Sequence, residues 1–137
     1  MLDPELTAQL KRVLNSIEQI LPRPVPPIDW SKARAANWRR HSFNGCLEAL
    51  TGVECIDLDD LLGIDSQKQM VVSNTLQFLS GLPANNALLW GTRGTGKSSL
   101  VRAILNRYSH RGLRVIQVDK NDLVYLPDIL DMIRAQL

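Results

Sequence analysis

The sequence predicts an α/β fold with a parallel-sheet core, preceded by a helical N-terminal region. A short apolar run at residues 87–90 leads through a glycine-rich loop into apolar residues at helical spacing over residues 98–108. A second apolar run, residues 114–119, precedes another helical pattern that begins at Pro127. Short strands that alternate with helices in this way are typical of a parallel sheet.

Composition narrows the class of protein. The chain has 137 residues, of which 45% are hydrophobic, and this predicts one globular domain with a core. The net charge of +2 is too small to indicate a nucleic acid or a membrane surface as partner. Residues 1–10 lack the pattern of a secretory signal, and no apolar run is long enough to span a bilayer. We therefore expect a cytoplasmic protein, and we expect neither nucleic acid nor a membrane as its partner.

Three regions follow one another along the chain. Residues 1–21 predict an amphipathic helix, because apolar residues recur at helical spacing after Asp3 and Pro4, a favourable cap and first-turn pair. Residues 22–46 predict a connector that is rich in proline at first and then in basic and aromatic residues. Its tryptophans and arginines fit either a nucleic-acid surface or a segment that is solvated or packed between subunits, and we favour the second interpretation. Residues 47–137 predict the α/β domain, with a helical segment up to residue 82 ahead of the first strand.

The glycine-rich loop carries the clearest chemical signal. Residues 91–98, GTRGTGKS, satisfy the pattern G-x-x-x-x-G-K-[ST] between an expected strand and an expected helix, as in P-loop nucleotide-binding proteins. Glycines let the backbone wrap closely around phosphate groups, and the helix N-terminus adds a partial positive charge. We predict that Lys97 bridges the β and γ phosphates and that the Ser98 hydroxyl ligates Mg²⁺. The predicted phosphate-binding residues are Gly91, Thr92, Arg93, Gly94, Thr95, Gly96, Lys97, Ser98 and Ser99.

The nucleotide is predicted to be ATP, but its fate is left open. The string DKND at residues 119–122 has the letters of a guanine-specificity motif in the wrong order. Hydrolysis needs a carboxylate at the end of a buried strand and usually a neighbouring glutamate. Asp119 ends an expected strand, but Lys120 follows it, and the acidic run at residues 55–60 precedes the loop. Three interpretations stay open: an ATPase, a nucleotide-binding module without turnover, and a P-loop kinase or other phosphotransferase that uses Asp119. No catalytic residue is assigned.

A longer set of strings resembles one family. NWRR, DLDDLLGIDSQKQ, GLPANNALLWGTRGTGKSSLVRAILNRY and GLRVIQVDKNDLVYLPDILDMIR are similar to the N-terminal half of bacterial AAA+ ATPases in a domain family of unknown function. The resemblance covers residues 38–137. It implies ATP and Mg²⁺ as cofactors, a ring-shaped homo-oligomer and a client of unknown identity. The family's Walker B strand, sensor residues and arginine finger would come after residue 137, so the P-loop core is expected to be incomplete.

The resemblance also implies an adenine contact and a sheet order. Leu62, Gly63 and Ile64 match the family segment that lines the adenine, while a helix-entry turn packed on the core is the alternative. In the family's sheet the two expected strands, residues 87–90 and 114–119, are separated by later strands. We therefore expect them either to expose unpaired edges or to pair with each other, and we expect a marginally stable chain.

Overall fold

The computed structural model describes residues 3–21, 25–41 and 44–136, and it is an α/β structure with a mixed three-stranded sheet. Strand β1 (Ala35–His41) lies between β2 (Asn44–Ala49) and β3 (Val115–Gln117). It pairs antiparallel with β2 and parallel with β3. The α/β class is thus confirmed, while the sheet is mixed rather than wholly parallel.

Strands β1 and β2 arise in a region where the sequence predicted a connector and then a helical segment. Alternate residues of β1 point to opposite faces, so Trp38 is buried while the neighbouring Arg39 is exposed. Trp38 lies directly opposite Leu47 of β2, and both belong to a buried cluster with Ile129. The prediction missed these strands because Trp38 beside the consecutive Arg39 and Arg40 resembles a basic surface segment until a partner strand is known. Residues 22–24 and 42–43 of the predicted connector lie outside the described residues.

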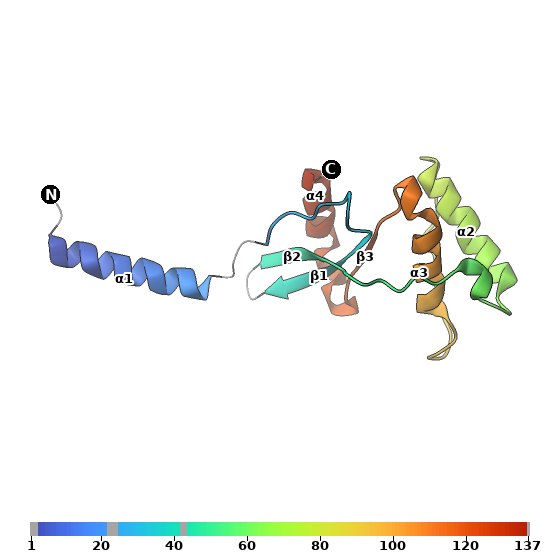
Figure 1. Cartoon of the computed structure of the whole chain (residues 1–137), viewed down its shortest axis with the longest axis horizontal. Coiled ribbons are helices and arrows are strands. Elements are labelled where there is room, and N and C mark those ends of the chain that lie inside the picture. The colour runs from blue at the N-terminus through green and yellow to red at the C-terminus, as the bar shows by residue number, and fades with distance from the viewer. Residues whose placement is uncertain (1–2, 22–24, 42–43, 137) are drawn as a thin grey trace.

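Four helical regions were predicted, and each contains an observed α-helix, but the region expected to be helical from residue 47 to residue 82 forms a helix only over α2 and begins inside β2. The observed α-helices are α1 (Pro4–Ile20), α2 (Asp65–Leu79), α3 (Lys97–Tyr108) and α4 (Leu126–Gln136). Helix α4 covers the sheet through Ile129, and α3 stands between the sheet and α2 (Figure 1). The main core gathers around the buried side of α3, with Leu58 from the short 3-10 helix η1 (Leu58–Asp60) packed against it.

Helix α1 extends away from the rest of the structure (Figure 1). It contains no buried residue, and its apolar side is about half exposed at Leu6, Leu10 and Ile17. Of the helices that the structure describes, none combines the length and apolar character that crossing a membrane requires.

The expected strand at residues 87–90 is not formed. The segment carries no regular secondary structure, and within the described chain no hydrogen bond engages the backbone of residues 86–90. Leu89 packs against the main core, whereas Leu88 is 85% and Trp90 86% exposed. The second expected strand is present as β3, but it pairs with β1 and not with this segment. A strand needs a neighbour to satisfy its backbone, and the described residues place none beside residues 87–90.

Candidate nucleotide-binding site

The loop at residues 91–96 depends on glycine for its shape. Gly91, Gly94 and Gly96 have φ angles of 140°, 88° and 83°, in the positive region that other residues rarely adopt. Gly96 is also the N-cap residue of α3, so the loop passes directly into the helix. All three glycines of the predicted motif therefore occupy positions where the backbone requires glycine.

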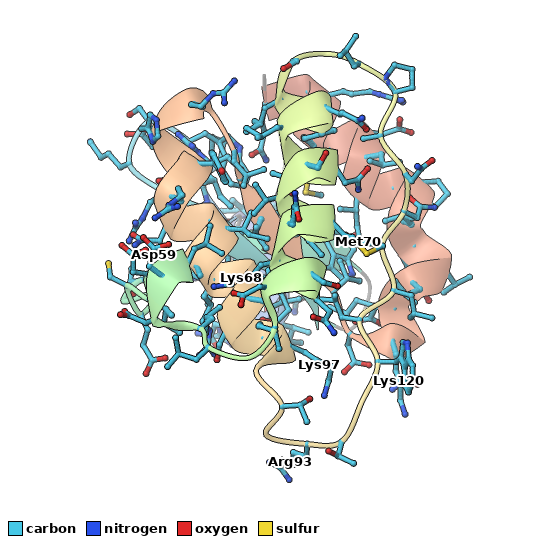
Figure 2. All side chains as sticks on the ribbon, turned by 90° about the vertical axis from the view of Figure 1, so that its right-hand side faces the viewer. Asp59, Lys68, Met70, Arg93, Lys97 and Lys120 are labelled. Carbon is cyan, nitrogen blue, oxygen red and sulfur yellow. The ribbon has the colours of Figure 1, made fainter. Side chains whose placement is uncertain are left out.

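The ammonium group of Lys97 lies on the inner side of its own loop. Its Nζ donates to the carbonyl oxygens of Gly91 at 2.9 Å and Thr92 at 2.6 Å, and to Thr95 Oγ1 at 3.1 Å. The Thr95 hydroxyl in turn donates to the Thr92 carbonyl at 2.9 Å. Figure 2 shows Lys97 directed into the loop and Arg93 at its outer tip. Among the described residues, the hydrogen-bond partners of the Lys97 ammonium are therefore all neutral oxygens of its own loop.

The N-terminus of α3 offers free hydrogen-bond donors. Its N-cap residue, Gly96, has no side chain to cap the helix, and the first backbone bond runs from Leu100 N to Gly96 O at 2.8 Å. Considering only described residues, the amides of Lys97, Ser98 and Ser99 have no partner. Ser98 is exposed and Ser99 half-buried. Unpaired amides at a helix N-terminus favour a bound anion.

The three residues predicted to contact adenine form the turn between η1 and α2. Leu62 is 84% exposed, Gly63 has a φ angle of 76°, and Ile64 is the N-cap residue of α2. The turn is therefore a helix entry, as the alternative interpretation expected, but Leu62 and Gly63 are exposed and not packed on the core. Its exposed leucine is still available to contact a planar base.

The carboxylates considered for catalysis are engaged elsewhere. Asp57 and Asp59 both pair with Arg107, and Asp119 accepts from the amide of Asn121 at the start of η3 (Lys120–Tyr125). The Asp59 amide and then the Arg107 guanidinium hold the pKa of Asp57 below its usual range. The described residues contain no group of three or more histidine, cysteine or acidic side chains that could hold a metal ion.

The tryptophans of the basic region are packed inside the structure. Trp38 is 6% exposed, and Trp30 is partly buried against the same cluster. Arg40 lies 4.4 Å above the ring of Tyr125 and 3.9 Å from Asp122. Both tryptophan rings therefore pack within the chain itself, which differs from the solvated or inter-subunit segment that the sequence favoured, and a stacking surface for nucleic acid needs exposed rings.

The comparison with known protein families matches residues 31–137 to the family described as protein of unknown function (DUF815). The chain belongs to this DUF815 family. It is also 34% identical over 74 residues to the replication factor C large subunit of Ignicoccus hospitalis. The aligned residues make up 53% of this chain and 15% of that protein. The corresponding subunit of Staphylothermus marinus is 35% identical over 71 residues, covering 51% of this chain and 16% of that protein. No solved structure matches the chain.

These similarities confirm an AAA+ ATPase-like family, as the resemblance implied. The matched part spans less than a fifth of the length of each replication factor C subunit. The activity and partners of those larger proteins therefore do not transfer directly to the DUF815 chain.

Sequence reasoning missed several contacts that position the loop of the DUF815 chain. Asn74 of α2 donates through Nδ2 to the Asn85 carbonyl at 2.6 Å and accepts from the Asn85 amide at 2.8 Å. This pair fixes the segment that leads into the loop. Arg107 and Lys68 similarly hold η1 against α3 and α2. No local pattern announces these roles, because each partner lies ten or more positions away in the sequence.

Proposed function

We propose that the chain binds ATP with Mg²⁺ through residues 91–98, as part of an AAA+ ATPase that assembles into a ring and acts on a client. One observation carries the proposal: the Lys97 ammonium and the unpaired amides of residues 97–99 lie at the same glycine-shaped turn. A cation and several amides at one helix N-terminus suit a polyphosphate.

The residues divide the work of binding. Phosphate oxygens would accept hydrogen bonds from the amides of Lys97, Ser98 and Ser99. The Lys97 ammonium would exchange its contacts with the neutral carbonyls of Gly91 and Thr92 for contacts with the phosphate chain. The exposed Ser98 hydroxyl would ligate Mg²⁺, which keeps its other ligands from phosphate and water. Bound Mg²⁺ supplies charge neutralisation at the β and γ phosphates. Leu62, Gly63 and Ile64 would contact the base.

Binding without turnover is a second candidate, and one observation favours it. Asp57, Asp59 and Asp119 are each held by contacts outside the loop. A carboxylate that serves hydrolysis must instead reach the Mg²⁺ shell or the attacking water. Phosphate release and phosphotransfer, both measured on the full chain with ATP·Mg²⁺, separate an ATPase, a phosphotransferase and a binding module.

A calorimetric titration with ATP·Mg²⁺ tests the binding itself. Lys97→Ala removes a charge-assisted contact worth about 1.5 to 3 kcal/mol, so the affinity should fall roughly 10- to 150-fold. Lys11→Ala is the matched control, because it removes the same charge from α1, which extends away from the loop. Equal affinities of Lys97→Ala and the unmodified chain would refute the proposal.

A further inference from the structure

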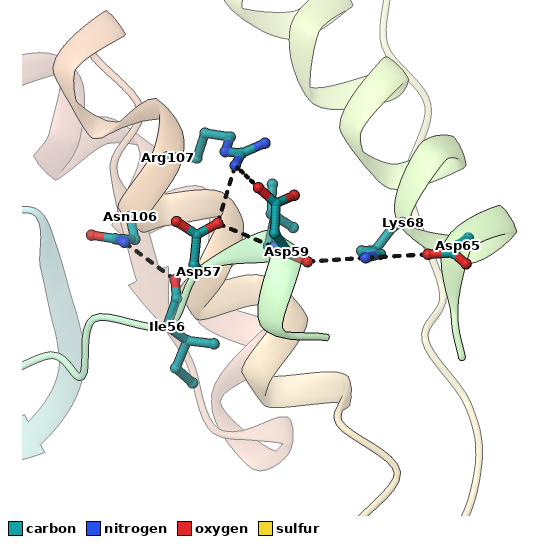
Figure 3. A network of polar contacts seen from close by, with 8 residues as sticks. Ile56, Asp57, Asp59, Asp65, Lys68, Asn106 and Arg107 are labelled. Atoms are coloured by element: carbon teal, nitrogen blue, oxygen red, sulfur yellow. Dashed lines mark hydrogen bonds and ion pairs between the residues drawn. The ribbon is translucent and has the colours of Figure 1, made fainter. Parts of the chain in front are cut away.

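A polar network, which we call the η1 network, ties the η1 segment to α3 (Figure 3). Arg107, in the last turn of α3, places Nη2 3.0 Å from Asp57 Oδ1 and 3.0 Å from Asp59 Oδ2. The preceding residue, Asn106, donates through Nδ2 to the Ile56 carbonyl at 3.2 Å. Two neighbouring residues of α3 thus hold residues 56–59 against the helix, one through the backbone and one through two carboxylates.

Lys68 adds a tie from α2 to the same segment. Its Nζ donates to the Leu58 carbonyl at 3.0 Å and lies 3.3 Å from Asp65 Oδ1 (Figure 3). The side chain of Lys68 is only 17% exposed, so the contact with the carbonyl is partly shielded from water. Lys68 therefore closes the stretch of chain between residues 58 and 68.

The turn at residues 62–64 lies inside this closed stretch. It begins after Leu61, the C-cap residue of η1, and it ends at Ile64, whose carbonyl accepts from the Lys68 amide at 2.8 Å. The exposed Leu62 side chain contributes little burial to hold the turn in place. Leu58 and Leu61 hold the start of the stretch on the core, and the contacts of Arg107 and Lys68 hold its polar groups.

Helix α3 relates this turn to the glycine loop. The helix begins at Lys97 and reaches Arg107 within one uninterrupted element. Its buried side, which includes Leu100 and Ile104, packs in the same core cluster as Leu58. A fixed helix with the loop at one end and the η1 network at the other sets the spacing between them.

We propose that Arg107 and Lys68 are positioning residues that hold the 62–64 turn at the place where it contacts the base of a nucleotide. The inference rests on the proposed function, since it requires the loop to hold the phosphates. Neither residue contacts the ligand. Their contribution is to binding of the base, and binding of the phosphates by residues 91–98 is independent of them.

The test compares a ligand that has a base with one that lacks it. ATP·Mg²⁺ and inorganic triphosphate with Mg²⁺ are titrated into the unmodified chain, Arg107→Met and Arg107→Lys. Arg107→Met should weaken ATP binding roughly two- to fivefold, in keeping with an exposed ion pair, and leave triphosphate binding unchanged. Arg107→Lys should restore most of the loss, because an ammonium group can still lie between the two carboxylates.

Arg102→Met is the matched control. Arg102 lies on the same helix, pairs with Glu54 at 2.9 Å and is 47% exposed, compared with 40% for Arg107. It does not hold η1, so both affinities should stay unchanged. Should Arg107→Met fail to fold, Lys68→Met takes its place with the same expected split between the two ligands.

The possible failures are distinguishable. If the unmodified chain binds neither ligand, the proposed function fails and the inference fails with it. If it binds both, and the substitutions weaken both equally or neither, the positioning role is overturned while nucleotide binding stands.

Discussion

Helices α1 and α3 have similar sequence patterns and opposite surroundings. Both show apolar residues at helical spacing, and both were predicted from that spacing. Helix α3 buries Leu100, Ala103, Ile104 and Leu105, whereas α1 buries nothing. The comparison shows that periodicity predicts a helix with an apolar side but does not say whether anything in the chain covers that side.

The two helices also begin differently. In α1, the Asp3 carboxylate accepts from the Glu5 amide at 3.2 Å, so an anion from the chain itself occupies the helix N-terminus. In α3, Gly96 offers no capping side chain, no described residue pairs with the first amides, and Lys97 adds a positive charge beside them. One N-terminus is closed by its own side chain, and the other is suited to an anion from outside.

The largest expected effect on the free energy of unfolding comes from truncating a buried leucine of α3, and an exposed leucine of α1 serves as the comparison. Leu100→Ala should lower the free energy of unfolding by about 2 to 5 kcal/mol, because Leu100 is 2% exposed and its loss leaves a cavity. Leu10→Ala, at a side chain 47% exposed, should change it by about 0.5 kcal/mol or less. Urea unfolding followed by tryptophan fluorescence measures both. A cost at Leu10 as large as that at Leu100 would show that α1 is packed in solution.

Gly96→Ala tests the open N-terminus of α3. An added methyl group meets no atom within 4 Å, but the φ angle of 83° should cost about 1 to 2 kcal/mol in the free energy of unfolding. Asn15→Ala on the exposed α1 serves as the control, with an expected change within about 0.5 kcal/mol. Unchanged stability of Gly96→Ala in the urea experiment would mean that the loop does not hold this conformation.

Asp3→Ala tests the closed N-terminus of α1. Loss of the cap should destabilise the helix by about 1 kcal/mol. Because no described residue packs on α1, the result should be reduced circular dichroism at 222 nm with an unchanged urea midpoint of the core. Glu18→Ala removes the same charge near the other end and should leave the helical signal intact. A shift of the core midpoint on Asp3→Ala would indicate that α1 and the core unfold together.

The smallest expected effect is the pH dependence of the stability that the ion pair between Asp57 and Arg107 contributes. The lowered pKa of Asp57 means that its contribution to stability is present above its ordinary pKa of about 4 and is lost as the pH falls through the lower value. The stability difference between the unmodified chain and Arg107→Met should therefore shrink between pH 7 and pH 3. Both side chains are exposed at the surface, so the difference is small at any pH. A difference that grows on acidification would contradict the assigned ion pair.

Much of the candidate site was predictable because it is local. The glycines, Lys97 and Ser98 lie within one turn of chain and helix, and the observed positive φ angles occur where the motif places glycine. The strands were less predictable, because a strand is defined by its partner. Residues 35–41 became β1 by pairing with the nearby residues 44–49 and with the distant residues 115–117, and residues 87–90 stayed unpaired among the described residues despite an apolar pattern typical of a strand.

The sequence alone determined the four helices, the glycine loop and the residues that the loop brings together, since each depends on neighbours a few positions apart. The tertiary structure decided which apolar sides are covered, which segments pair as strands, and how Arg107 and Lys68 hold the 62–64 turn. Those features join residues from different elements, many of them far apart in the chain. Their energies depend on distances and burial that only the folded arrangement fixes.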